Sequence, residues 1–247
     1  MEENQENQNT ENPENTSNFN INSEDLKKET QETVNQVKDT IKNVNIKKDS
    51  QEAKGFLSAF FKNPLEELRK VSSDSKNSFL KIAIIILVIW LAATLIVNVF
   101  GFASTYLFGT FGSFERFFKN LFPNMFSVLK DLIAPLIAIA VLSGLVYGFK
   151  KNKNKSFLTI SSTIVVAKIP IVIATVAELL TIFGTQVTKL TSAFSGFCSI
   201  LSAVLLYFAI KELSDEGENK SYFWKFALII GIFYVIKFIF SYLGIYL

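Results

Sequence analysis

The chain of 247 residues carries 25 Lys and Arg against 22 Asp and Glu, and this small excess is not gathered into the basic face of a nucleic-acid-binding protein. It has no histidine, which removes the usual general base at neutral pH and the commonest transition-metal ligand. Its one cysteine, Cys198, permits neither an intrachain disulfide nor a zinc site of Cys and His ligands. Because no P-loop, G-x-G-x-x-G, H-E-x-x-H or G-x-S-x-G motif occurs either, we predict no catalytic, metal or cofactor-binding residue, and no nucleic-acid partner.

Residues 1–55 form a polar N-terminal tail. Residues 1–22 hold five Glu and no basic residue, so they lack the apolar surface needed to offset their ordering entropy and we predict disorder. From Leu26 to Val44 the apolar side chains recur at helical spacing, which predicts a helix within 23–46, either amphipathic or only transient. The tail has no apolar signal-peptide core, so we expect the first span to act as the insertion signal.

The segment 56–81 is predicted to be amphipathic and to lie on the membrane surface. Its apolar face consists of Phe56, Leu57, Phe60, Phe61, Leu65 and Leu68. Lys62, Arg69 and Lys70 lie beside that face and are predicted to be interfacial anchors. The basic residues of this segment outnumber its acidic ones, which favours contact with an anionic cytoplasmic leaflet.

Five apolar segments follow in 82–247, and each is long enough to cross a bilayer. Roughly 20 apolar residues at about 1.5 Å per residue cross a hydrocarbon core of about 30 Å. The predicted spans cover about 82–102, 124–149, 160–184, 190–210 and 226–247. The predicted fold class is therefore all-α, a polytopic bundle of five transmembrane helices. A second interfacial helix is predicted from Phe114 to Phe122, ended by Pro123.

Lysine-rich loops predict the orientation of the bundle. The segment before the first span, the loop at Lys150 to Lys155 and the loop from Lys211 to Lys225 are basic, and they alternate with two loops that are poorer in Lys and Arg. The positive-inside rule then places the N-terminus in the cytoplasm and the C-terminus outside the cell membrane. Trp224, at the inner end of the fifth span, is a further predicted interfacial anchor.

Charged residues within the spans are the candidates for a functional role. Glu178 and Lys237 lie at compatible depths, and because a charge near the bilayer centre costs at least about 2.5 kcal/mol, we predict that they form an intramembrane pair. The pair is either structural or part of a relay, and unpaired or snorkelling side chains are the third alternative. Lys168 is nearer the inner surface and is expected to snorkel, and Asp131 is placed near the end of its span.

Small residues recur along one face of the fourth span. They are Ser192, Ser195, Gly196, Ser199 and Ser202. Such a face lets helices approach closely and exchange hydrogen bonds, so we predict that it is a helix-packing face rather than a substrate path.

The layout of a long polar N-terminus before five closely spaced spans resembles that of the Yip-domain family, in its bacterial form. The resemblance covers about 56–247, and Ala167-Lys168-Ile169-Pro170 is similar to a small-residue-then-proline feature of that family. It implies a non-enzymatic membrane protein; the best-known members interact with Rab or Ypt GTPases. The family's Asp-Leu-Tyr-Gly-Pro motif precedes its first span, whereas Asp131-Leu132-Ile133-Ala134-Pro135 lies in the second, so no GTPase-binding residue is carried across.

Two classes of function follow from these observations. The first is a membrane protein without enzymatic activity that organises lipid or recruits partners through its tail and interfacial helices. The second is a small permease or ion-coupled transporter that uses Glu178 and Lys237, although five spans fit an inverted repeat poorly. The lipid bilayer is the expected partner, and the sequence leaves open both a protein partner at the tail and a homo-oligomer.

Overall fold

The computed structural model describes residues 23–43, 45–106, 114–149, 155–183, 185–214 and 221–242, and within them every regular element is helical. This confirms the predicted all-α class for the described residues. The elements are α1 (Ser23–Lys42), α2 (Ile46–Lys62), α3 (Pro64–Ser72), α4 (Leu80–Tyr106), α5 (Phe114–Phe149), α6 (Phe157–Ala167), α7 (Ile169–Glu178), η1 (Leu179–Phe183), α8 (Thr185–Ser214) and α9 (Ser221–Tyr242). The predicted disorder of residues 1–22 lies outside the described residues.

Four of these helices are long and apolar enough to cross a bilayer. The matching stretches are Leu80–Ala103 in α4, Lys119–Phe149 in α5, Val187–Ser214 in α8 and Tyr222–Tyr242 in α9. A fifth span exists if α6 and α7, which meet at a bend of 46°, are counted together. The chain therefore has the helices of a multi-pass membrane protein.

The bend between α6 and α7 has a local cause in the Ala167-Lys168-Ile169-Pro170 sequence. Proline lacks the backbone N–H that would continue the helix and disfavours helical backbone at the residue before it. The N–H of Ile171 consequently bonds the carbonyl of Lys168 at 2.9 Å instead of the carbonyl of Ala167. The freed Ala167 oxygen accepts a hydrogen bond of 3.1 Å from the Ser202 hydroxyl of α8, which ties the bend to its neighbour.

The predicted interfacial helix before the second span is not separate. Pro123 lies inside α5, which continues without interruption from Phe114 to Phe149. The carbonyl of Lys119, which Pro123 cannot bond, belongs to an exposed turn where water or lipid head groups can reach it. The prediction that Pro123 ends a helix is therefore wrong, because a proline interrupts only one backbone hydrogen bond when its surroundings satisfy the freed carbonyl.

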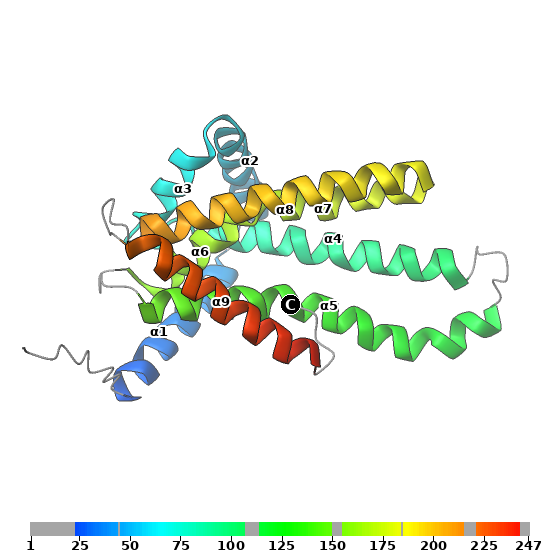
Figure 1. Ribbon diagram of the computed structural model, residues 1–247, viewed down its shortest axis with the longest axis horizontal. Coiled ribbons are helices and arrows are strands. Elements are labelled where there is room, and N and C mark those ends of the chain that lie inside the picture. The colour runs from blue at the N-terminus through cyan, green and yellow to red at the C-terminus, as the bar shows by residue number, and fades with distance from the viewer. Residues whose placement is uncertain are drawn as a thin grey trace, which may run out of the picture.

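The helices run side by side along the long axis of the molecule (Figure 1). We call one end the capped end: it carries α2 and α3, the start of α4, the junction of α5 with α6 and that of α8 with α9. The opposite end carries the end of α4, the start of α5 and the turn from η1 into α8. The segments predicted to be basic thus lie at the same end, although Lys150, Lys151 and Lys153 fall outside the described residues.

Helices α2 and α3 pack on the bundle and form what we call the cap, residues 46–79. Phe56, Phe60, Leu68 and Val71 of the cap are buried in one hydrophobic core with residues of α4, α6, α8 and α9. Most of the apolar face predicted to lie in the membrane surface is therefore covered by protein. Among the cap side chains whose exposure the structure describes, the large apolar ones that face outward are Phe61, 63% exposed, and Leu65, 41% exposed.

A polar cluster fastens the end of the cap to the start of α6. Asn77 has a positive φ of 54°, and its side-chain oxygen accepts hydrogen bonds from Ser156 at 2.8 Å and Thr159 at 3.0 Å. The Thr159 hydroxyl also donates to the Asp74 carbonyl at 2.8 Å. Asparagine tolerates the left-handed conformation better than most residues, so one side chain both permits the turn and anchors it.

Candidate functional site

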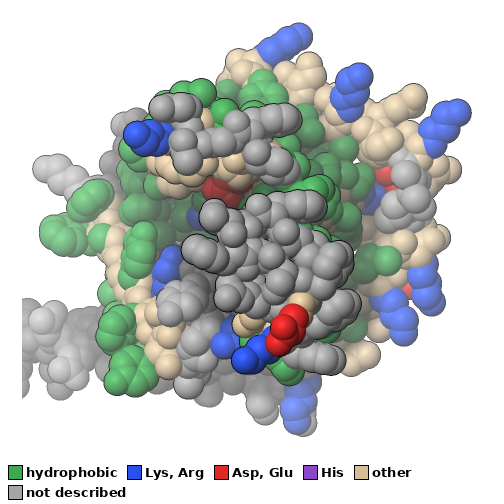
Figure 2. Space-filling view, turned by 90° about the vertical axis from the view of Figure 1, so that its right-hand side faces the viewer, with side chains coloured by type: hydrophobic (Ala, Val, Ile, Leu, Met, Phe, Trp, Pro, Cys, Tyr) green, Lys and Arg blue, Asp and Glu red, His purple; other side chains and the backbone are tan. Residues whose placement is uncertain are grey.

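The cap carries an outward surface that is strongly basic. Its exposed basic side chains are Lys47, Lys48, Lys54, Lys62, Arg69, Lys70 and Lys76, whereas its exposed acidic side chains are Glu52 and Glu66. In the space-filling view from the opposite end, Lys and Arg side chains protrude along the right-hand margin and hydrophobic ones cover much of the left (Figure 2). The basic side chains of the cap matter because a basic surface attracts anionic lipid head groups.

Two acidic residues of the cap are turned inward, which leaves the outer surface basic. Asp49 is 2% exposed; its carboxylate accepts a hydrogen bond of 2.8 Å from the Asn45 N–H and lies 3.8 Å from the Lys81 ammonium. Glu67 is buried and accepts a hydrogen bond of 2.7 Å from Lys70. Asp49 joins the cap to Lys81 of α4, and Glu67 offsets the charge of Lys70 from beneath the surface.

The four predicted anchors lie near the capped end, in different environments. Lys62 is exposed at the end of α2. Arg69 donates two hydrogen bonds, of 3.2 and 3.1 Å, to the Glu212 carboxylate of α8, and Lys70 pairs with Glu66 at 3.0 Å. Hydrogen bonding from the Lys70 ammonium lowers the pKa of Glu66 below its usual range, and bonding to Glu67 and Glu66 raises the pKa of Lys70. Trp224 is 73% exposed near the start of α9.

A cavity of about 610 Å³ lies inside the bundle. Its walls come from α4, α5, α8, α9 and the bend between α6 and α7, and most of them are apolar. Three charged residues line it, Asp131, Lys168 and Lys237, together with the hydroxyls of Thr94 and Ser199. Its size is in the range of small-molecule sites.

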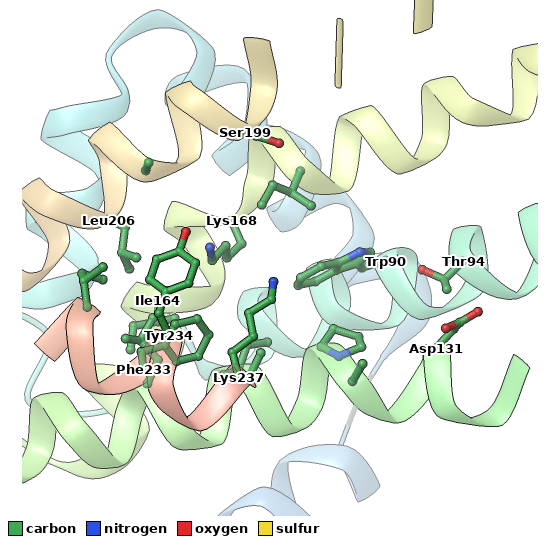
Figure 3. Close-up of a pocket in the computed structure, with 18 of the residues that line it drawn as sticks. Trp90, Thr94, Asp131, Ile164, Lys168, Ser199, Leu206, Phe233, Tyr234 and Lys237 are labelled. Carbon is green, nitrogen blue, oxygen red and sulfur yellow. The ribbon is translucent and has the colours of Figure 1, made fainter. Parts of the chain in front are cut away.

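The bend and α9 bring Lys168 and Lys237 to the same cavity. Both side chains point into the same space from different elements, and Trp90 lies beside Lys237 (Figure 3). The two ammonium groups share this space, and like charges repel each other. Among the described residues neither forms a hydrogen bond or ion pair. Asp131 lies farther along the cavity, next to Thr94, and the described ion pairs do not include it.

The structure does not bring Glu178 and Lys237 together as predicted. Glu178 ends α7, it does not line the cavity, and the described ion pairs do not join it to Lys237. Glu178 follows Lys168 at the bend by ten residues, about 15 Å along a helix axis. Glu178 is therefore displaced along the bundle from the level of the bend, and depth alone did not reveal this.

The predicted packing face of α8 contributes only in part to packing. Ser202 is fully buried and Ser195 is half-buried, but Ser192, Gly196 and Ser199 are exposed. The hydroxyls of Ser192 and Ser199 donate to carbonyls of their own helix, at 2.8 and 2.9 Å. The buried face runs instead through Cys198, Leu205, Ala209 and Leu213, which carry no polar signal that the sequence could have revealed.

We find no protein-family model that matches this chain, and no similar protein among curated proteins or solved structures. The resemblance to the Yip-domain family therefore stays a prediction. Within the described part of the chain, no group of three or more Cys, Asp or Glu residues is placed to hold a metal ion. The two features with a chemical character of their own are the basic cap and the lysine-lined cavity.

Proposed function

We propose that this chain is a non-enzymatic integral membrane protein that organises lipid at the cytoplasmic surface through its cap. The observation that supports this proposal is the outward face of the cap, where seven exposed basic residues stand against two exposed acidic ones. Phe61 at the end of α2 and Leu65 at the start of α3 are exposed and add an apolar contact suited to the head-group region. Each Lys near an anionic surface contributes about 1 kcal/mol, so the cap should collect anionic lipids.

The proposal includes a cytoplasmic N-terminus, an outer C-terminus and a Yip-type role in recruiting partners to the membrane. Location of the basic segments at one end of the bundle supports the orientation. Helix α1, which precedes the cap and has mostly exposed side chains, is the part of the chain that we expect a protein partner to contact.

Lipid clustering in vesicles tests this function. The full chain is reconstituted in phosphatidylcholine vesicles with a minor share of fluorescent phosphatidylglycerol, and self-quenching of the label is measured. We expect the native chain to increase quenching and the variant with Gln at Lys47, Lys48, Lys54 and Lys62 to lose the effect. The matched control carries Gln at Lys27, Lys28, Lys38 and Lys42 of α1, which removes the same charge outside the cap. Equal quenching by both variants would contradict the proposal.

A small permease is the second candidate, favoured by the cavity. The charged groups available to it are Lys168, Lys237 and Asp131, which line the cavity, rather than the predicted pair of Glu178 and Lys237. Uptake of a radiolabelled organic anion into proteoliposomes, compared between the native chain and Lys237→Met, tests this candidate. Uptake that depends on Lys237 would favour the permease over the lipid-organising protein.

A further inference from the structure

We propose that the cavity binds the anionic group, phosphate or carboxylate, of a membrane amphiphile between Lys168 and Lys237. This inference rests on the proposed lipid-organising function and names the lipid class that the bundle holds. Its starting point is the juxtaposition of two lysine ammonium groups in one cavity (Figure 3). No described residue neutralises either of them through an ion pair.

Charge and desolvation explain why this cavity favours an anion. A lysine at membrane depth is costly unless it has a partner or reaches water, and two lysines that point into one cavity carry like charges. With Asp131 the cavity walls hold two cationic groups and one anionic group. An anion between the lysines would be bonded by both ammonium groups, and hydrogen bonds between charged partners are about twice as strong as neutral ones.

The route into the cavity points to an amphiphile rather than to a soluble anion. The end of α8 and the start of α9 meet at the capped end, and from there the two helices diverge along the bundle (Figure 1). At their junction Tyr222 donates a hydrogen bond of 2.7 Å to the Tyr207 carbonyl, and Phe226 packs against the Tyr207 ring at 5.0 Å between centroids. This aromatic contact closes the gap between the two helices at the capped end.

Between the diverging helices the cavity walls reach the lipid-facing surface. Ser199 and Ala203 of α8 and Tyr234 of α9 line the cavity and are also exposed. Beside them the outer faces carry exposed apolar side chains, such as Ile200 and Phe238. An anionic head group can therefore occupy the cavity while its acyl chain extends between α8 and α9 to the lipid-facing surface. A soluble anion has no acyl chain and would gain nothing from this apolar route.

Lipid retention measured by native mass spectrometry tests the assignment. The full chain is taken from nanodiscs containing equal amounts of phosphatidylglycerol and phosphatidylcholine, and the lipids that remain bound are counted. We expect the native chain to prefer phosphatidylglycerol, and the double variant Lys168→Met, Lys237→Met to lose at least about ten-fold of that preference, because a charge-assisted hydrogen bond contributes at least that factor. The matched control, Lys130→Met with Lys189→Met, removes two exposed lysines of α5 and α8 that do not line the cavity and should keep the preference.

Two further measurements keep the test decisive. The double variant Lys168→Arg, Lys237→Arg retains both positive charges and should keep the preference, so its loss there would overturn the role of charge. Melting with inorganic phosphate alone separates the sources: equal protection of the native chain by phosphate and by phosphatidylglycerol overturns the assignment to an amphiphile. An unchanged preference in the methionine variant overturns the site itself. Because the cap remains intact in these variants, clustering of labelled lipid should persist, so failure of the cavity assignment is distinguishable from failure of the proposed function.

Discussion

Replacing Ser202 by Ala isolates the hydrogen bond that ties the bend between α6 and α7 to α8. The Ser202 hydroxyl is fully buried and donates to the Ala167 carbonyl at 3.1 Å, an oxygen that the helix itself leaves free beside Pro170. Ser→Ala removes one oxygen atom and leaves little space behind. Side-chain hydrogen bonds between membrane helices contribute about 0.6 kcal/mol on average and up to about 1.7. Leaving a buried carbonyl without a partner costs about 1–3 kcal/mol, so we expect a loss of about 1–2 kcal/mol.

The assay is equilibrium unfolding of the purified chain in mixed micelles, followed by helical circular dichroism as the fraction of denaturing detergent increases. A loss of that size lowers the ratio of folded to unfolded chain by a factor of about 5–30. Ser199→Ala is the matched control, since its hydroxyl is exposed and bonds its own helix, and it should change stability by less than about 0.5 kcal/mol. Equal effects of Ser202→Ala and Ser199→Ala would refute the role given to the bend.

Three other substitutions test separate parts of the structure. Gly196→Ala should leave stability unchanged or raise it by up to about 1 kcal/mol, because an added Cβ meets no atom within 4 Å and alanine favours helix. Destabilisation or loss of an oligomer in the unfolding assay would show that this face packs against a second copy. Asp49→Ala should destabilise the cap by about 1–2 kcal/mol, since it removes a helix-capping acceptor. Its melting temperature should be lower than that of the Glu52→Ala variant, which serves as the control. Because Lys70 lowers the pKa of Glu66, their contact stabilises the chain at neutral pH, and this contribution disappears as the pH falls through the folded-state pKa of Glu66. Lys70→Met should raise the pKa of Glu66 in an NMR titration. An unchanged pKa would show that the contact is not formed in solution.

Length and hydropathy predicted most of the bundle, because the bilayer thickness determines how many apolar residues a span needs. Hydropathy did not reveal that the cap packs on the bundle instead of lying in the membrane surface. Phe56, Phe60 and Leu68 look alike whether they face lipid or a protein core, since both surroundings are apolar, and the sequence pattern records only that they avoid water. Pro123 was misleading for a related reason: proline stops a helix only where its freed carbonyl has no other partner.

The cavity could be predicted only in part. The sequence identified Lys168, Lys237 and Asp131 as charges within or near spans, but it assigned Lys168 to snorkelling and placed Asp131 at a helix end. Position along a helix predicts depth, whereas the neighbour that a side chain faces depends on how each helix is rotated and on the bend at Pro170. Glu178 was paired with Lys237 on depth alone, whereas the bend and the rotation of the helices leave it outside the cavity that Lys237 lines.

Sidedness of the two ends of the bundle tests the central claim that the cap faces the cytoplasmic leaflet of a membrane-spanning protein. In a Cys198→Ala background, single cysteines replace Ser58, exposed on the cap, or Thr188, exposed near the opposite end, and intact cells are treated with a membrane-impermeant thiol reagent. The account predicts labelling of Thr188→Cys from outside, and of Ser58→Cys only after permeabilisation. Labelling of both positions from the same side would contradict it.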